Sequence, residues 1–116
     1  MSETEFSRIG LFSSLPGETL RLLSGRMSRE PVPAGTEVVS EGAEGDRFFV
    51  VLSGVLAVTQ EAQGERRMLK AGDYFGEVAL VMNMPRTASI RALTPAVIAT
   101  CDRATFDEFV RPLFSD

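Results

Sequence analysis

Residues 75–89, FGEVALVMNMPRTAS, hold the pattern that decides the fold and function of this chain. Glu77 follows a glycine and opens a short apolar run, and Arg86 stands nine residues further on, after a loop that contains Pro85. The apolar run predicts a short helix, and the first backbone N–H groups of a helix have no partner within it, so they attract an anion. Arg86 adds a planar guanidinium that suits phosphate, and Glu77 adds a carboxylate that can accept a hydrogen bond from a hydroxyl. The stretch therefore predicts a site for a ligand with both groups.

Neighbouring residues of the same stretch are expected to shape this site. Gly76 has no Cβ, so a ligand can approach the backbone closely there. Thr87 places a hydroxyl beside the arginine. The apolar side chains of Val78, Leu80 and Val81 are expected to face the protein interior and to hold the helix in place.

Outward from this stretch, the chain divides into helical ends around a β middle. Residues 1–27 are expected to be helical, with Pro16 at the first position of a helix. Residues 28–101 contain short apolar runs separated by turn residues about every eight to twelve positions, which predicts an antiparallel sandwich or roll. Residues 102–112 predict a final helix, and the side chain of Asp102 is expected to cap it.

Composition narrows the possible functions. The 116 residues suffice for one domain with a single core, and the net charge of −4 with scattered arginines argues against a nucleic-acid partner. The chain has no histidine and one cysteine, so we expect no metal site, no catalytic residues and no enzyme activity. No apolar run is long enough to span a membrane, and the lone Cys101, expected to be a buried inert thiol, fits a cytoplasmic protein.

The pattern of residues 75–89 resembles the phosphate-binding cassette of the cyclic nucleotide-binding domain family. This family includes the regulatory subunit of protein kinase A, cyclic nucleotide-gated channels and the bacterial catabolite activator. The likeness extends to residues 41–54 and 71–74, so that it covers nearly the whole chain. It implies a mostly β fold: an antiparallel jelly-roll-like β-barrel with short N-terminal helices, a short cassette helix and a C-terminal helix.

The resemblance also implies roles for the cassette, which we define as residues 75–89. Glu77 would bind the ribose 2′-hydroxyl and Arg86 the cyclic phosphate. The ligand would be cAMP, with cGMP as the second candidate, since a threonine at position 87 can bond the guanine amino group in this family. No other cofactor is implied. The expected ligand-binding residues are Phe75, Gly76, Glu77, Val78, Ala79, Leu80, Pro85, Arg86, Thr87 and Ala88.

Several alternatives stay open at this point. Glu77 could be only a favourable charge at a helix N-terminus, and Arg86 could be ion-paired with it. A domain of the same fold that has lost nucleotide binding could serve as an interaction element. A cupin-like enzyme is a further rival, although the absence of histidine counts against it. We expect the effector domain, and the helix that folds over the base as a lid in many members of this family, to lie outside these residues, and both a stand-alone module and a piece of a longer protein stay open.

Overall fold

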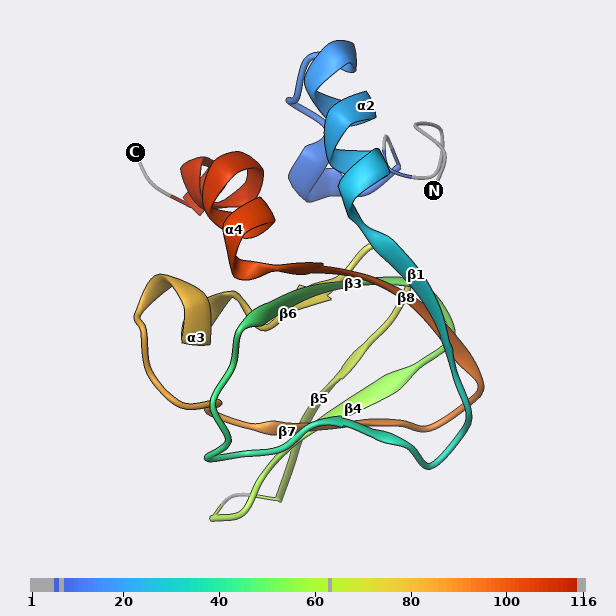
Figure 1. The fold of residues 1–116 in the computed structure, drawn as a ribbon. Coiled ribbons are helices and arrows are strands. Elements are labelled where there is room, and N and C mark those ends of the chain that lie inside the picture. Colours follow the sequence, from blue (N-terminus) through green and yellow to red (C-terminus); the bar gives the residue numbers. More distant parts are fainter. Residues whose placement is uncertain (1–5, 7, 63, 115–116) are drawn as a thin grey trace.

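The computed structural model describes Phe6, residues 8–62 and residues 64–114, and it shows two four-stranded antiparallel sheets with helices at one end (Figure 1). The first sheet has the order β1 (Ser28–Val32), β8 (Ala96–Asp102), β3 (Arg47–Ser53) and β6 (Tyr74–Phe75). The second has the order β2 (Glu37–Val39), β7 (Ser89–Ala92), β4 (Leu56–Gln60) and β5 (Gly64–Leu69). The predicted fold class is confirmed, with one difference: in the described part of the chain no strand pairing joins the two sheets, so the roll is not a closed barrel.

Strand β3 is buried on both faces, which explains its unbroken apolar sequence. Because side chains alternate along a strand, Phe48 and Val50 point to one face while Phe49 and Val51 point to the other. The first pair belongs to a core shared with the terminal helices, and the second pair belongs to the core inside the β-roll. Strand β8 contributes to both cores in the same way, with Ala99 and Cys101 in the first and Ala96 and Ile98 in the second, so two central strands join the helices to the roll.

The helical ends pack against the same face of the first sheet (Figure 1). At the N-terminal end lie the 3-10 turn η1 (Gly10–Phe12) and α2 (Gly17–Arg26). Pro16 directly precedes α2, one position before the predicted place. None of the helices in the described part of the chain has both the length and the hydropathy needed to span a bilayer.

The C-terminal helical segment consists of α4 (Arg103–Thr105), the π-helical turn η2 (Phe106–Val110) and the 3-10 turn η3 (Arg111–Phe114). The side chain of Asp102 accepts a hydrogen bond of 2.9 Å from the Thr105 N–H, which confirms the predicted cap. Helical turns continue to Phe114, past the predicted end at residue 112. In the core beneath this segment, burial raises the pKa of Cys101 to about 12, so this thiol stays protonated and inert.

Candidate functional site

The cassette helix, α3 (Glu77–Val81), begins directly after Gly76, which is in the left-handed region with φ of 95°. A Cβ at this glycine would lie 2.9 Å from the Arg47 carbonyl oxygen and 2.9 Å from Nη1 of Arg86. Glycine is therefore required here both for the backbone conformation and for the space. The chain turns sharply from β6 into the helix as a result.

The apolar residues of α3 differ in their burial. Ala79 and Leu80 are buried, and Val81 is half-buried. Val78 is 39% exposed, so the prediction that it faces the interior is wrong. Positions 78 and 80 lie about 200° apart around an α-helix, so both cannot face the core of so short a helix.

A cavity of about 110 Å³ lies where the cassette meets the second sheet; we call it the site cavity. Eight of the ten predicted site residues line it, whereas Leu80 and Pro85 do not. Leu80 lies fully buried behind α3, and Pro85 lines a separate hollow beside Arg103. The residues around the site cavity are Val39, Val58, Arg67, Phe75, Gly76, Glu77, Val78, Ala79, Arg86, Thr87, Ala88 and Ile90.

Four of these wall residues have no role in the sequence analysis: Val39, Val58, Arg67 and Ile90. Each comes from a strand of the second sheet, and strand pairing brings them together; Val58, for example, stands opposite both Arg67 and Ile90. The order of strands in a roll is not written in local sequence, so no nearby pattern could have identified them.

Arg86 is held inside the protein by backbone oxygens. Its side chain donates from Nη1 to the Gly76 carbonyl at 3.0 Å and from Nη2 to the Arg47 carbonyl at 2.9 Å. The residue is only 8% exposed, and its guanidinium lies 5.6 Å from the ring centroid of Phe49. Burial lowers the pKa of Arg86, while the charges of Asp46 and Glu77 raise it. The result is an oriented, buried cation.

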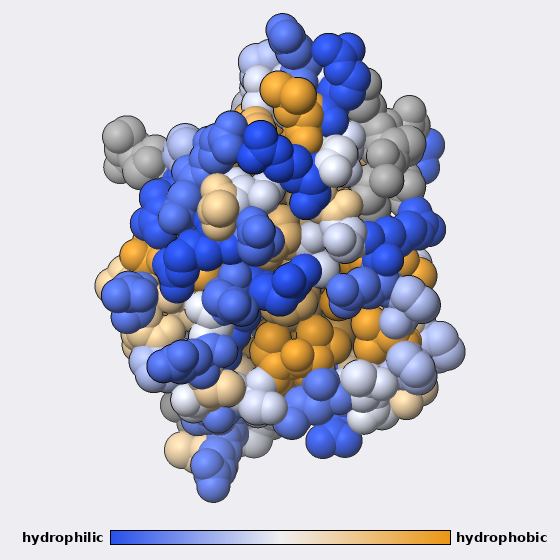
Figure 2. All heavy atoms as spheres, viewed as in Figure 1, coloured by the Kyte–Doolittle hydropathy of each residue, from blue (hydrophilic) through white to orange (hydrophobic). Residues whose placement is uncertain are grey.

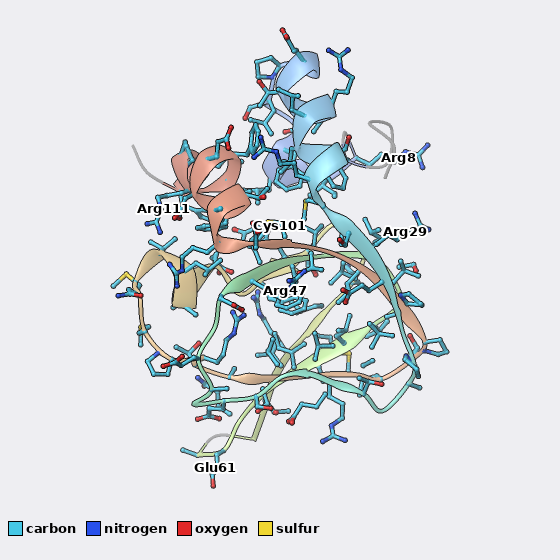
Figure 3. The ribbon with its side chains drawn as sticks, viewed as in Figure 1. Arg8, Arg29, Arg47, Glu61, Cys101 and Arg111 are labelled. Atoms are coloured by element: carbon cyan, nitrogen blue, oxygen red, sulfur yellow. The ribbon has the colours of Figure 1, made fainter. Side chains whose placement is uncertain are left out.

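Two hollows meet at this cation. Besides the site cavity, Arg86 borders a hollow of about 280 Å³ that is lined by Val38, Val39 and Phe49 among others. On the face shown in Figure 2, hydrophobic residues gather over the β-roll and hydrophilic residues frame them. Figure 3 labels Arg47, whose carbonyl holds Arg86 while its own Nε donates to Thr100 Oγ1 at 3.1 Å.

Glu77 carries a buried acceptor that no group in the described part of the chain satisfies. Its Oε2 atom is buried and accepts no hydrogen bond there. Burial raises the pKa of Glu77, while its own backbone N–H and the charges of Arg67 and Arg86 lower it. No ion pair between Glu77 and Arg86 is observed among the described residues. A buried acceptor without a partner costs about 1–3 kcal/mol, so this atom is suited to a donor from outside the protein.

A buried cation and an open acceptor at one cavity are suited to binding a ligand. Comparison with known proteins identifies the family of this fold. The family model described as Cyclic nucleotide-binding domain matches residues 29–112. The chain therefore belongs to the cyclic nucleotide-binding domain family. This confirms the resemblance found in the sequence, and the cupin-like alternative is wrong.

Two curated relatives are a regulatory subunit of a protein kinase and a protein kinase. The chain is 33% identical over 112 residues to the cAMP-dependent protein kinase regulatory subunit of Debaryomyces hansenii, covering 97% of this chain and 25% of that protein. It is 37% identical over 112 residues to cGMP-dependent protein kinase, isozyme 1, of Drosophila melanogaster, covering 90% of this chain and 15% of that protein. The chain thus spans a quarter or less of these two relatives.

A solved structure of cAMP-bound PfPKA-R has the same fold. The two structures superpose with a TM-score of 0.92 at 26% sequence identity, over 97% of this chain and 40% of that chain. The arrangement of two antiparallel sheets with terminal helices is thus the arrangement of a cyclic nucleotide-binding domain.

Proposed function

We propose that this domain binds a cyclic nucleotide in the site cavity and acts as the sensor of a signalling protein whose effector lies outside this chain. The observation that carries the proposal is the juxtaposition of Arg86, a buried cation, with Glu77, whose buried Oε2 lacks a donor, at one cavity. A cyclic nucleotide carries an anionic phosphate and, on the neighbouring ribose carbon, a 2′-hydroxyl that can donate a hydrogen bond. The phosphate can therefore pair with Arg86, and the hydroxyl can donate to Glu77 Oε2.

The cyclic phosphate is assigned to Arg86 and to the start of α3. A guanidinium has five N–H donors, and the bonds to Gly76 and Arg47 use two of them, so donors remain for phosphate oxygens. The first N–H groups of α3 have no helical acceptor and add further donors. Gly76 keeps this approach free of a side chain.

The ribose 2′-hydroxyl is assigned to Glu77, and the base to the outer part of the cavity near Thr87. The Thr87 carbonyl accepts a hydrogen bond of 2.9 Å from Gln60 Nε2, which holds the backbone of this exposed residue. We assign cAMP as the ligand and expect cGMP to be tolerated, because the Thr87 hydroxyl can accept from the guanine amino group. The similarity to both a cAMP-dependent and a cGMP-dependent kinase supports this breadth.

One observation favours the alternative function, a nucleotide-free interaction element. Arg86 already has two carbonyl acceptors and an aromatic neighbour, so it stabilises the fold without any ligand. The unsatisfied Glu77 Oε2 argues against this reading, because a purely structural site would leave no buried acceptor open.

Calorimetric titration with cAMP, cGMP and 5′-AMP tests the proposal. We expect cAMP to bind with a Kd of about 1 μM or tighter. We expect 5′-AMP to bind much more weakly, because its phosphate is not closed into a ring with the ribose. Arg86→Lys should weaken cAMP binding, since an ammonium cannot replace the planar fork. Arg91→Lys is the matched control: Arg91 also donates to a glycine carbonyl, that of Gly35 at 3.3 Å, but it lies outside the site cavity. Absence of cAMP binding would support the interaction element instead.

A further inference from the structure

The C-terminal end of α3 is completed by a residue from a distant part of the chain. The last carbonyl groups of a helix have no partner within it. In α3 the Val78 carbonyl accepts from the Met82 N–H at 2.9 Å, and the Ala79 carbonyl accepts from the Met84 N–H at 3.2 Å. The Leu80 carbonyl accepts instead from Nη2 of Arg111 at 3.0 Å. Arg111 lies 31 positions further along the chain.

Arg111 is itself held in place from the C-terminal helical segment. Asp107 Oδ1 lies 2.9 Å from Nε and 2.9 Å from Nη2 of Arg111. The guanidinium also lies 5.7 Å from the ring centroid of the buried Phe106. Figure 3 shows the labelled Arg111 side chain where the C-terminal segment approaches α3. Because the side chain is fixed before it reaches Leu80, its bond restrains the position of the helix.

Arg103 makes a second, longer contact with the same carbonyl. Its Nη1 lies 3.4 Å from the Leu80 oxygen, and its Nη2 lies 3.4 Å from the Gly45 oxygen. Both contacts are near the limit of a hydrogen bond, so the Arg111 bond is the stronger restraint. The side chain of Leu80 is fully buried in the core shared with Phe106.

The other end of α3 carries the proposed ligand groups. Leu80 follows Glu77 by three residues, which is about 4.5 Å along a helix axis. Because α3 has only five residues, Leu80 and Glu77 are neighbours on successive turns, and a shift of the helix at Leu80 also displaces Glu77. We propose that Arg111 is a positioning residue: through the Leu80 carbonyl it fixes α3 against the C-terminal segment and raises the affinity of the site without touching the ligand. This inference rests on the proposed function.

Arg26 provides a matched control. Like Arg111, it pairs with an acidic residue of η2, Glu108 at 2.9 Å, and its guanidinium stacks over a phenylalanine, Phe109 at 5.2 Å. Nη1 of Arg26 donates its hydrogen bond to Oε1 of Glu108, which lies outside the cassette. Replacing either arginine by glutamine removes one ion pair and one ring contact, but only Arg111→Gln removes the bond to Leu80.

The experiment compares Arg111→Gln with Arg26→Gln in the ligand-free protein and with cAMP. Amide hydrogen exchange in the free protein should accelerate at Met82 and Met84 in Arg111→Gln only. The cAMP affinity should fall about three- to tenfold in Arg111→Gln, which is the effect of one hydrogen bond, and stay within a factor of two in Arg26→Gln. Unchanged exchange at both amides, or an equal or tighter affinity in Arg111→Gln, would overturn the inference.

A milder pair of variants covers the case in which Arg111→Gln fails to fold. Asp107→Asn releases Arg111 while keeping it in the chain, and Glu108→Gln does the same for Arg26. Only Asp107→Asn should change exchange and affinity, in the same direction and by less. If the wild-type protein binds no cyclic nucleotide, the proposed function is wrong, and so is the expected effect of Arg111 on cAMP affinity. The exchange at Met82 and Met84 still decides whether Arg111 holds α3.

Discussion

Replacing Glu77 by glutamine should stabilise the free protein and weaken its ligand binding. The buried Oε2 of Glu77 has no donor among the described residues, and a buried acceptor without a partner costs about 1–3 kcal/mol. A neutral amide has a smaller desolvation penalty than a carboxylate, so we expect a gain of about 1 kcal/mol in the free energy of unfolding. For a domain of this size, that gain raises Tm by about 4 °C.

The pH dependence of the free energy of unfolding distinguishes the desolvation of the Glu77 carboxylate from an effect of packing. Burial holds the pKa of Glu77 above its ordinary value of 4.5, so the group binds its proton more tightly in the folded than in the unfolded state. Its contribution to stability is therefore fully present below the unfolded pKa and is lost as the pH rises through the folded pKa. Wild type and Glu77→Gln should thus be equally stable at low pH, and the variant should become the more stable one towards neutral pH.

Bound cAMP should make the wild type more stable than Glu77→Gln. If the ribose hydroxyl bonds Glu77 with about 2 kcal/mol, the variant binds about 30-fold more weakly. At a ligand concentration of about 100 times the wild-type Kd, the wild type gains about 2.7 kcal/mol and the variant about 0.9 kcal/mol. The difference of about 1.8 kcal/mol exceeds the initial advantage of the variant, so the wild type should melt higher when cAMP is present.

Thermal unfolding by circular dichroism, with and without cAMP and at two pH values, measures all of these quantities. Glu30→Gln, at an exposed position on β1, is the control and should change stability by less than about 0.5 kcal/mol. A 2′-deoxy analogue should bind the wild type less well than cAMP, and this difference should shrink in Glu77→Gln. A variant that is less stable than wild type at neutral pH, or an order that cAMP leaves unchanged, would refute the reasoning.

Arg86→Ala should lower cAMP affinity about tenfold to several hundredfold and also reduce the free energy of unfolding by about 1–3 kcal/mol, because two backbone carbonyls lose their donor. Calorimetry and thermal unfolding measure both, with Arg91→Ala as control. Gly76→Ala should destabilise the domain by about 1–3 kcal/mol through its φ of 95° and its crowded Cβ position, whereas Gly10→Ala, which meets no atom within 4 Å, should not. Thr87→Ala should lower cGMP affinity about tenfold and barely change cAMP affinity in a competition assay. Equal loss for both nucleotides would show that Thr87 does not reach the base.

Much of the fold was predictable because its signals are local. Turn residues separated the short strands, and the side chain of Asp102 was suited to cap the final helix. The cassette was recognisable for the same reason. Gly76, Glu77 and Arg86 belong to one continuous stretch of sequence, and all three line the site cavity.

The errors and omissions arise from long-range contacts. Val78 was expected in the interior together with Leu80, but the orientation of a short helix depends on what it packs against, and Ala79 faces the core beside Leu80 while Val78 does not. The bond from Arg86 to the Arg47 carbonyl, which lies 39 positions away, was not predicted at all. No sequence pattern connects such residues, since the distance between them is set by how distant segments pack in the folded chain.

The amino-acid sequence was thus enough to predict the class of fold, the place of the cassette and the chemistry of Glu77 and Arg86. The groups that surround these two residues became known from the folded chain: the wall residues from the second sheet, the carbonyl partners of Arg86, the open acceptor of Glu77 and the bond from Arg111 to Leu80. The physical reason is that backbone conformation and residue chemistry act over a few neighbouring residues. Burial, cavity walls and helix-end partners depend instead on segments that meet only when the chain has folded.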